Sequence, residues 1–283
     1  MKLQNYRKGL KNLGKKRKPK AFLFGPFLVE LSWEFYRFAP YAIYMKKHNP
    51  DIKIIVLTRE TRFDLYGKYA DILIPLRIKN EEVFPQREFG LAGYKTEYYD
   101  TIKKYFYEKY NKRFDVVNHF CPLINGWKRK IRWQFPRDKM SYDFQSKEKT
   151  CDVVKEIVRE DDIIVDNEAV GFINMDRYIE LNATDLFRKI HIGFVIEALK
   201  RCEYVIGNMN YEISHLAVLL KKPLISLNEK LSDDDIHLLN PLRTPIIRCN
   251  NIREGVDIYE NNFRSEKGGT GEQRRVIHFN KIS

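Results

Sequence analysis

The sequence lacks the long apolar runs and the cysteine spacings that define several classes of protein. No stretch approaches the about 18–20 consecutive apolar residues of a membrane-spanning helix. The four cysteines show no CxxC spacing, which argues against a zinc site and a disulfide framework and favours a reducing compartment. The basic start of the chain has no apolar core, so we expect no signal peptide. These absences favour a cytoplasmic protein that is at most peripheral to a membrane.

The motifs of several common enzyme classes are absent as well. The sequence contains no Ser-His-Asp order, no Walker phosphate loop and no HExxH zinc motif. Three consecutive aspartates at 233–235 could bind a divalent ion, but after Ser232 they are more typical of a capped helix start. We therefore expect no metal site.

The composition is that of a folded and strongly basic protein. Its 283 residues suffice for two domains of ordinary size, and the hydrophobic content of 43% favours packed cores. The formal charge of +13 favours an anionic partner, either nucleic acid or the surface of a membrane. We expect a basic flexible tail at 1–20, an N-terminal domain at 21–145, a C-terminal domain at 146–263, and a flexible tail with a weak terminal strand at 264–283.

Short apolar runs alternate with amphipathic segments in both expected domains, which is typical of parallel α/β sheets. In the first domain, the runs at 21–24, 53–57 and 71–75 predict strands, and a helix is expected at about 29–47. In the second, the segment 188–228 reads as helix, strand, helix and strand with very short connections. Such an order winds a parallel sheet, so the expected fold class is α/β with two Rossmann-like halves.

Polar residues follow the expected strands, where open α/β sheets bind their ligands. The N-terminus of the helix after a strand offers unpaired N–H groups and a positive dipole end to an anion such as a phosphate. Hydrogen bonding inside the helix packing is the alternative role for any one of these residues. The candidate binding residues are Asn167, Glu168, Arg177, Asn208, Asn210, Glu212, Ser214, His215, Arg243 and Thr244.

The segment VIGNMNYEISHLAVLLKKPLISL resembles the donor-binding segment of GT-B glycosyltransferases, most closely their heptosyltransferase-like branch. His215, Ala217, Lys222 and Pro223 keep the register of the family pattern. The turn GNMN at 207–210 departs from it, because the family usually carries an acidic residue and a Ser or Thr-Gly there. The resemblance implies two Rossmann-like domains facing a cleft. It also implies that the candidate binding residues hold a nucleotide sugar, which is the donor substrate, without a further cofactor.

The stretch GPFLVELSWEFYRFAP at 25–40 carries two glutamates four residues apart, Glu30 and Glu34, on one face of the expected helix. Carboxylates near a helix N-terminus are also stabilised by the helix dipole, which is a purely structural reason for them. In the family that the chain resembles, an acid after the glycine loop of the first strand is the catalytic base. Glu30 takes that place and Glu34 is the second candidate. The implied reaction is hexosyl or heptosyl transfer to an acceptor hydroxyl, and we expect it to be metal-independent.

The stretch 126–149 interleaves cations with aromatic rings. This mixture suits single-stranded or flipped-out nucleic acid, and it suits the interfacial zone of a membrane nearly as well. An ordinary basic loop with inward-packed aromatics is a third interpretation. We expect an anionic acceptor, a glycolipid at a membrane surface or a nucleic acid, to contact Trp127, Lys128, Arg129, Lys130, Arg132 and Trp133. The alternative function is non-catalytic nucleic-acid binding on a Rossmann-like scaffold.

Overall fold

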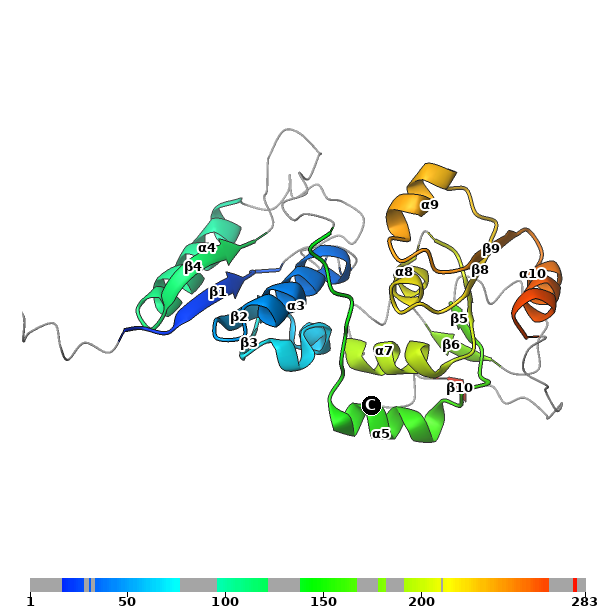
Figure 1. Ribbon diagram of the computed structural model, residues 1–283, viewed down its shortest axis with the longest axis horizontal. Coiled ribbons are helices and arrows are strands. Elements are labelled where there is room, and N and C mark those ends of the chain that lie inside the picture. Colours follow the sequence, from blue (N-terminus) through cyan, green and yellow to red (C-terminus); the bar gives the residue numbers. More distant parts are fainter. Residues whose placement is uncertain are drawn as a thin grey trace, which may run out of the picture.

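A computed structural model provides the structure of the chain, and its strands form two separate parallel sheets, one from each half of the sequence. Figure 1 shows the first sheet and its helices at one end of the molecule and the second sheet at the other. The structure describes residues 17–27, 31, 34–76, 96–121, 138–166, 178–181, 191–209, 211–264 and 277–278.

The first half of the chain builds a four-stranded sheet. Its elements are β1 (Lys20–Phe24), the π-helical turn η1 (Glu34–Phe38), α3 (Ala39–His48), β2 (Lys53–Thr58), the 3-10 helices η2 (Glu60–Leu65) and η3 (Gly67–Tyr69), β3 (Ile72–Pro75), α4 (Thr96–Asn111) and β4 (Asp115–Phe120). The strand order is β3-β2-β1-β4. Alternate residues of β1 bury opposite faces, because Phe22 and Phe24 pack on the side of α3 whereas Ala21 and Leu23 pack on the side of α4.

The second half builds a six-stranded sheet in the order β10-β6-β5-β7-β8-β9. Its elements are α5 (Glu148–Ile157), β5 (Ile164–Asp166), β6 (Ile179–Leu181), α7 (Ile192–Arg201), β7 (Val205–Gly207), α8 (Glu212–Leu219), β8 (Leu224–Leu227), α9 (Asp233–Leu239), β9 (Ile246–Cys249), α10 (Ile252–Tyr259), the π-helical turn η7 (Glu260–Arg264) and β10 (Ile277–His278). Ile164 and Val205 pack on the side of α7 and α8, whereas Val165 and Ile206 pack on the side of α10.

The expected fold class is confirmed, since each described strand pairs in parallel with its neighbours and helices cover both faces of both sheets. The helix expected at about 29–47 is described at Leu31 and from residue 34 onward, and the rest of its start lies outside the described residues. From residue 34 it is a π-helical turn followed by α3, with Pro40 early in the first turn of α3, where a residue without an N–H group is tolerated. The domain boundaries stay predictions, and β10, inside the expected terminal tail, pairs with β6.

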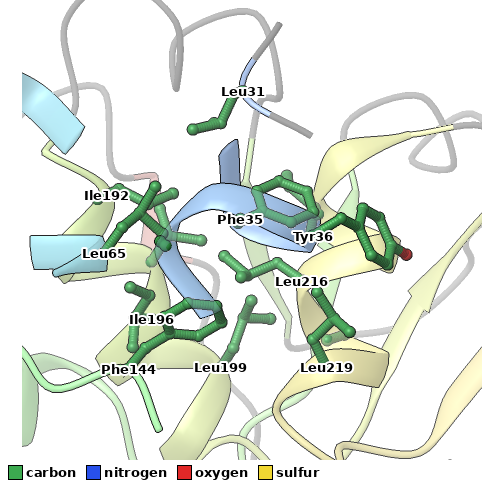
Figure 2. Close-up of a cluster of buried hydrophobic side chains, with 14 of the residues drawn as sticks. Leu31, Phe35, Tyr36, Leu65, Phe144, Ile192, Ile196, Leu199, Leu216 and Leu219 are labelled. Carbon is green, nitrogen blue, oxygen red and sulfur yellow. The ribbon is translucent and has the colours of Figure 1, made fainter. Parts of the chain in front are cut away.

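One hydrophobic cluster contains residues of both halves. Figure 2 shows Phe35 and Leu65 of the first half beside Ile192, Ile196 and Leu216 of the second. All five side chains are almost wholly buried. The two sheets therefore share part of their apolar core, and the elements η1, η2, α7 and α8 meet there.

The expectations about cysteines and membrane spans can be compared with the described residues. All four cysteines are free, and Cys202 is wholly buried. Burial raises the pKa of its thiol to about 12. Within the described ranges, no helix combines the length and the apolar character that crossing a membrane requires.

Candidate functional site

Four of the candidate binding residues meet at the carboxyl edge of the second sheet. β7 and β8 pair up to Gly207 and Ser226, so the turns that follow them leave the sheet side by side. α8 begins directly after the turn of β7, with Tyr211 as its N-cap. This arrangement gathers four of the predicted side chains, namely Asn208, Glu212, Ser214 and His215. Their role in binding stays a prediction.

A glutamate that the sequence analysis did not select holds these turns together. One carboxylate oxygen of Glu229 accepts hydrogen bonds from the backbone N–H of Met209 at 3.0 Å and from the Ser226 hydroxyl at 2.8 Å. The other oxygen accepts from the backbone N–H of Leu231 at 2.9 Å. The side-chain amide of Asn208 donates to the Leu227 carbonyl at 2.6 Å. These hydrogen bonds fix the turns to each other before any ligand binds. Less conformational entropy of the protein is therefore lost when a ligand binds here.

His215 ties the start of α8 back to the turn before it. Its Nε2 lies 2.5 Å from the Met209 carbonyl oxygen. Because a carbonyl oxygen only accepts, Nε2 carries the proton of the neutral ring. Burial lowers the pKa of His215 to about 4, so the ring is neutral near pH 7. Its Nδ1 is then a buried acceptor, and the described residues offer it no hydrogen-bond donor.

Ser214 presents a second buried polar atom at this edge. The residue has no exposed surface, and its Oγ has no hydrogen-bond partner among the described residues. A Cβ atom built on Gly207 would lie 2.3 Å from this Oγ and 3.4 Å from the Cβ of Asp166, at the end of β5. Buried hydroxyls almost always have a partner, so a polar group of a ligand bound here would gain a hydrogen bond.

Glu34, the second candidate for the catalytic base, lies in a closed cluster of the first half. Its carboxylate has no exposed surface and accepts hydrogen bonds from Thr58 Oγ1 at 2.6 Å and from the Tyr66 hydroxyl at 2.8 Å. Arg62 forms a buried ion pair with it at 2.8 Å. The pKa of Tyr66 is held well above its usual value by burial and by the neighbouring Glu34, so its hydroxyl remains a donor. This geometry favours a structural role for Glu34, because no face of the carboxylate is open to a substrate.

The structure places two other candidates away from this edge. Arg243 and Thr244 precede β9, which runs parallel to β8, so they lie at the amino edge of the sheet. Thr244 is buried, and its hydroxyl donates to the Val218 carbonyl near the C-terminal end of α8. Their position corrects the prediction that they join the other binding residues. The prediction assumed that these residues follow a strand, whereas they precede one.

The remaining candidates lie outside the described residues. They are Glu30, Asn167, Glu168, Arg177 and Asn210, together with the acceptor set Trp127, Lys128, Arg129, Lys130, Arg132 and Trp133. Within the described ranges, no group of three His, Cys, Asp or Glu side chains could hold a metal ion. The expectations of a metal-free site and of no further cofactor stay predictions.

Comparisons with known proteins give matches of structure only, because no family model and no curated protein sequence matches the chain. The crystal structure of the glycosyl transferase family 9 from Veillonella parvula DSM 2008 superposes with a TM-score of 0.51 at 12% identity. This match covers 88% of the present chain and 93% of the other. The chain has the fold of a GT-B glycosyltransferase.

Two further solved structures are similar at lower scores. E. coli ADP-heptose lps heptosyltransferase II has a TM-score of 0.47 at 10% identity, over 84% of this chain and 98% of that chain. E. coli heptosyltransferase WaaC with ADP has a TM-score of 0.43 at 11% identity, over 88% of this chain and 100% of that chain. The match to the glycosyl transferase family 9 structure confirms the expected remote resemblance to GT-B glycosyltransferases at the level of fold.

Proposed function

We propose that the chain is a glycosyltransferase that moves a sugar from a nucleotide-sugar donor to an acceptor hydroxyl. The observation that carries the proposal is the turn after β7, in which Asn208 and Met209 are held by hydrogen bonds just before α8 at the carboxyl edge of the second sheet. In open α/β sheets, this edge is where ligands bind. The likeness in fold to a glycosyl transferase family 9 structure, over most of both chains, supports this chemistry over other uses of a parallel sheet.

The donor would bind with its phosphates at the start of α8. The first N–H groups of a helix have no partner inside the helix, and they lie at the positive end of its dipole. Ser214 and His215 belong to the first turns of α8, and each carries a buried polar atom that has no hydrogen-bond partner among the described residues. In this proposal these two atoms hydrogen-bond the nucleotide part or the sugar of the donor.

Transfer would need a base on the acceptor side, and we assign that role to Glu30. Its carboxylate takes the proton of the acceptor hydroxyl while the hydroxyl oxygen forms a bond to the anomeric carbon of the sugar. The bond from that carbon to the phosphate oxygen breaks, and the nucleoside diphosphate leaves. Helix N–H groups stabilise the charge that develops on it, so the proposed hexosyl or heptosyl transfer is metal-independent.

The acceptor is proposed to be anionic because the chain carries a formal charge of +13. The cations and indole rings at 127–133 would contact it. A glycolipid at a membrane surface fits a cytoplasmic, peripheral protein, since cations pair with its phosphates and tryptophan rings rest in the interfacial zone.

A screen of melting temperature against nucleoside diphosphates and nucleotide sugars tests this function. A ligand that binds only the folded state raises the melting temperature, by an amount that grows with concentration above its Kd. We expect one nucleotide sugar and its diphosphate to stabilise the protein, and the sugar donor to be consumed when an acceptor is added. Stabilisation by none of them at millimolar concentration would contradict the proposal.

A further inference from the structure

The π-helical turn η1 connects the first half of the chain to the proposed donor site. All five of its residues are buried. Its first residue, Glu34, is fixed in the first half by the buried ion pair with Arg62 and by two further hydrogen bonds. π-Helical turns are rare, and they are frequent at functional sites. The backbone of η1 is therefore held by the first half, and its side chains can position groups of the second.

Tyr36 of η1 reaches the second half with both its hydroxyl and its ring. The hydroxyl donates to the Leu239 carbonyl at 2.8 Å. The ring meets the His215 ring edge-on, with 5.4 Å between centroids and 67° between planes, which is a favourable geometry for two rings. Tyr36 is buried, and Figure 2 shows its ring beside Leu216 of α8. The ring is thus fixed at both ends, by η1 and by α9, and lies against His215.

The His215 ring is restrained at two places. Its Nε2 donates to the Met209 carbonyl, which fixes that atom but leaves the tilt of the ring open. The edge contact with Tyr36 removes this freedom and so sets the direction of Nδ1. Nδ1 is buried and has no hydrogen-bond partner among the described residues. A polar atom that is held in one direction without such a partner is arranged for a ligand.

The protonation of the His215 ring decides which ligand group it can bind. Because Nε2 carries the proton, Nδ1 of the neutral ring can only accept a hydrogen bond. Burial lowers the pKa of His215, which keeps the ring neutral near pH 7. An unprotonated phosphate oxygen also only accepts, so it cannot pair with Nδ1. The matching group is a hydroxyl or an N–H of the ligand.

We propose that Tyr36 is a positioning residue, whose ring holds His215 so that Nδ1 accepts a hydrogen bond from a hydroxyl or N–H of the nucleotide sugar. This inference rests on the proposed function, and it adds that a residue of the first half positions a binding group of the second. The ring carries this role, whereas the hydroxyl serves the contact with Leu239. A variant that keeps the ring therefore keeps the affinity, and a variant without the ring loses the hydrogen bond to the ligand.

Calorimetric titration of the full chain tests this with ADP and ADP-glucose, UDP and UDP-glucose, and GDP and GDP-mannose. Tyr36→Leu removes the ring, and Tyr36→Phe keeps it. The control is Tyr204→Leu, because Tyr204 is also buried and packs its ring on Tyr259, 4.4 Å away, on the α10 side of the second sheet. We expect Tyr36→Leu to weaken the nucleotide sugar that binds by about tenfold, as the loss of one hydrogen bond does. Tyr36→Phe and Tyr204→Leu should leave that affinity unchanged.

A double variant shows whether Tyr36 acts through His215. His215→Gln alone should weaken the same ligand to a similar degree. If Tyr36 only positions that ring, Tyr36→Leu combined with His215→Gln should bind no more weakly than His215→Gln alone. The parent diphosphate then locates the ligand group. Equal weakening of the diphosphate places the group on the nucleoside, and weakening of the nucleotide sugar alone places it on the sugar.

Several results would overturn the inference while the proposed function stands. They are unchanged affinity in a folded Tyr36→Leu protein, equal weakening by Tyr36→Phe or Tyr204→Leu, and additive losses in the double variant. If Tyr36→Leu does not fold, Tyr36→Met replaces it, because a flexible methionine fills irregular gaps. Failure of both variants to fold would make Tyr36 a core residue without this role. If the wild type binds none of these ligands, the inference fails together with the proposed function.

Discussion

The side-chain hydroxyl of Tyr36 donates a hydrogen bond to the backbone carbonyl of Leu239, across 203 residues of sequence, at 2.8 Å. Tyr36 belongs to η1 of the first half, and Leu239 is the last residue of α9 in the second. The Tyr36 ring also meets the ring of His215 edge-on, with 5.4 Å between centroids. Figure 2 shows this ring beside Leu216 and Leu219. The residues after the first strand therefore help to join the two halves at the proposed site.

Replacing Tyr36 by Phe tests what this hydrogen bond contributes. The pKa of Tyr36 is held well above its usual value, and burial is the largest cause. The hydroxyl therefore stays a donor at neutral pH. We expect Tyr36→Phe to lower the free energy of unfolding by about 1 kcal/mol, the net value of one hydrogen bond, as measured in urea. Tyr105→Phe is the control, because Tyr105 is 65% exposed. Equal stability of both variants would show that the contact between Tyr36 and Leu239 is energetically neutral.

Glu30 and Glu34 are four residues apart in sequence, and replacing them should have different effects. Glu34→Gln removes one charge of the buried ion pair between Glu34 and Arg62, so we expect a loss of about 3–5 kcal/mol in the free energy of unfolding. The control Asp152→Asn breaks the exposed ion pair with Lys155 and should cost less than about 1 kcal/mol. Glu30→Gln should leave stability and donor binding intact while turnover drops by about two to four decades.

Two results would contradict these expectations for Glu30 and Glu34. Near-normal turnover of Glu30→Gln, measured as release of nucleoside diphosphate, would remove Glu30 from the role of base. A stable but inactive Glu34→Gln variant would return that role to Glu34, whatever its closed geometry suggests.

The strands were predictable from the sequence because a buried parallel strand is a continuous apolar run. The runs at 21–24 and 53–57 correspond to β1 and β2 within a residue. The segment that forms η2 and η3 escaped prediction, because ten residues with no clear period carry no signal for short 3-10 helices. α10 was missed as well, although its N-cap Asn251 accepts a hydrogen bond from the backbone N–H of Arg253 and is a typical start signal.

The site was predictable only as far as its edge of the sheet. Asn208, Ser214 and His215 follow a strand directly, so their position could be inferred from sequence order. The partners of Glu34 lie 24 to 32 residues away, and sequence spacing holds no information on such contacts. Glu229 escaped selection for the same reason, because its bond to Met209 joins two different turns.

His215 should give the protein an acid sensitivity that a variant can remove. Its pKa is about 4 in the folded protein, because of burial, against about 6.5 in an unfolded chain. Between these pH values the unfolded chain binds a proton at this residue and the folded protein does not. The contribution of His215 to the free energy of unfolding is therefore fully present above about pH 6.5 and decreases as the pH falls toward 4. We expect His215→Gln to reduce this slope, by at most about 1.4 kcal/mol per pH unit.

Urea unfolding at several pH values measures this slope. Burial also lowers the pKa of His119, so part of the slope should remain in the variant. The exposed His237 supplies the control variant, His237→Gln. The same His215→Gln protein should bind a nucleoside diphosphate more weakly if Nδ1 contacts the donor. If the slope becomes flatter and the affinity stays the same, His215 stabilises the turn before α8 and does not contact the donor.

The last prediction concerns Gly207 and Ser214, because a side chain added at Gly207 would meet the hydroxyl of Ser214. A methyl group on Gly207 would lie 2.3 Å from Ser214 Oγ but 3.7 Å from Ser214 Cβ, so the clash is with the hydroxyl alone. We expect Gly207→Ala to cost about 1–3 kcal/mol in the free energy of unfolding, as overpacking does. Ser214→Ala alone should cost little, since the hydroxyl has no partner among the described residues. The double variant should then recover most of the loss, which a double-mutant cycle in urea measures as a favourable coupling. If the losses of the two single variants simply add in the double variant, the cost of Gly207→Ala does not come from a clash with the Ser214 hydroxyl.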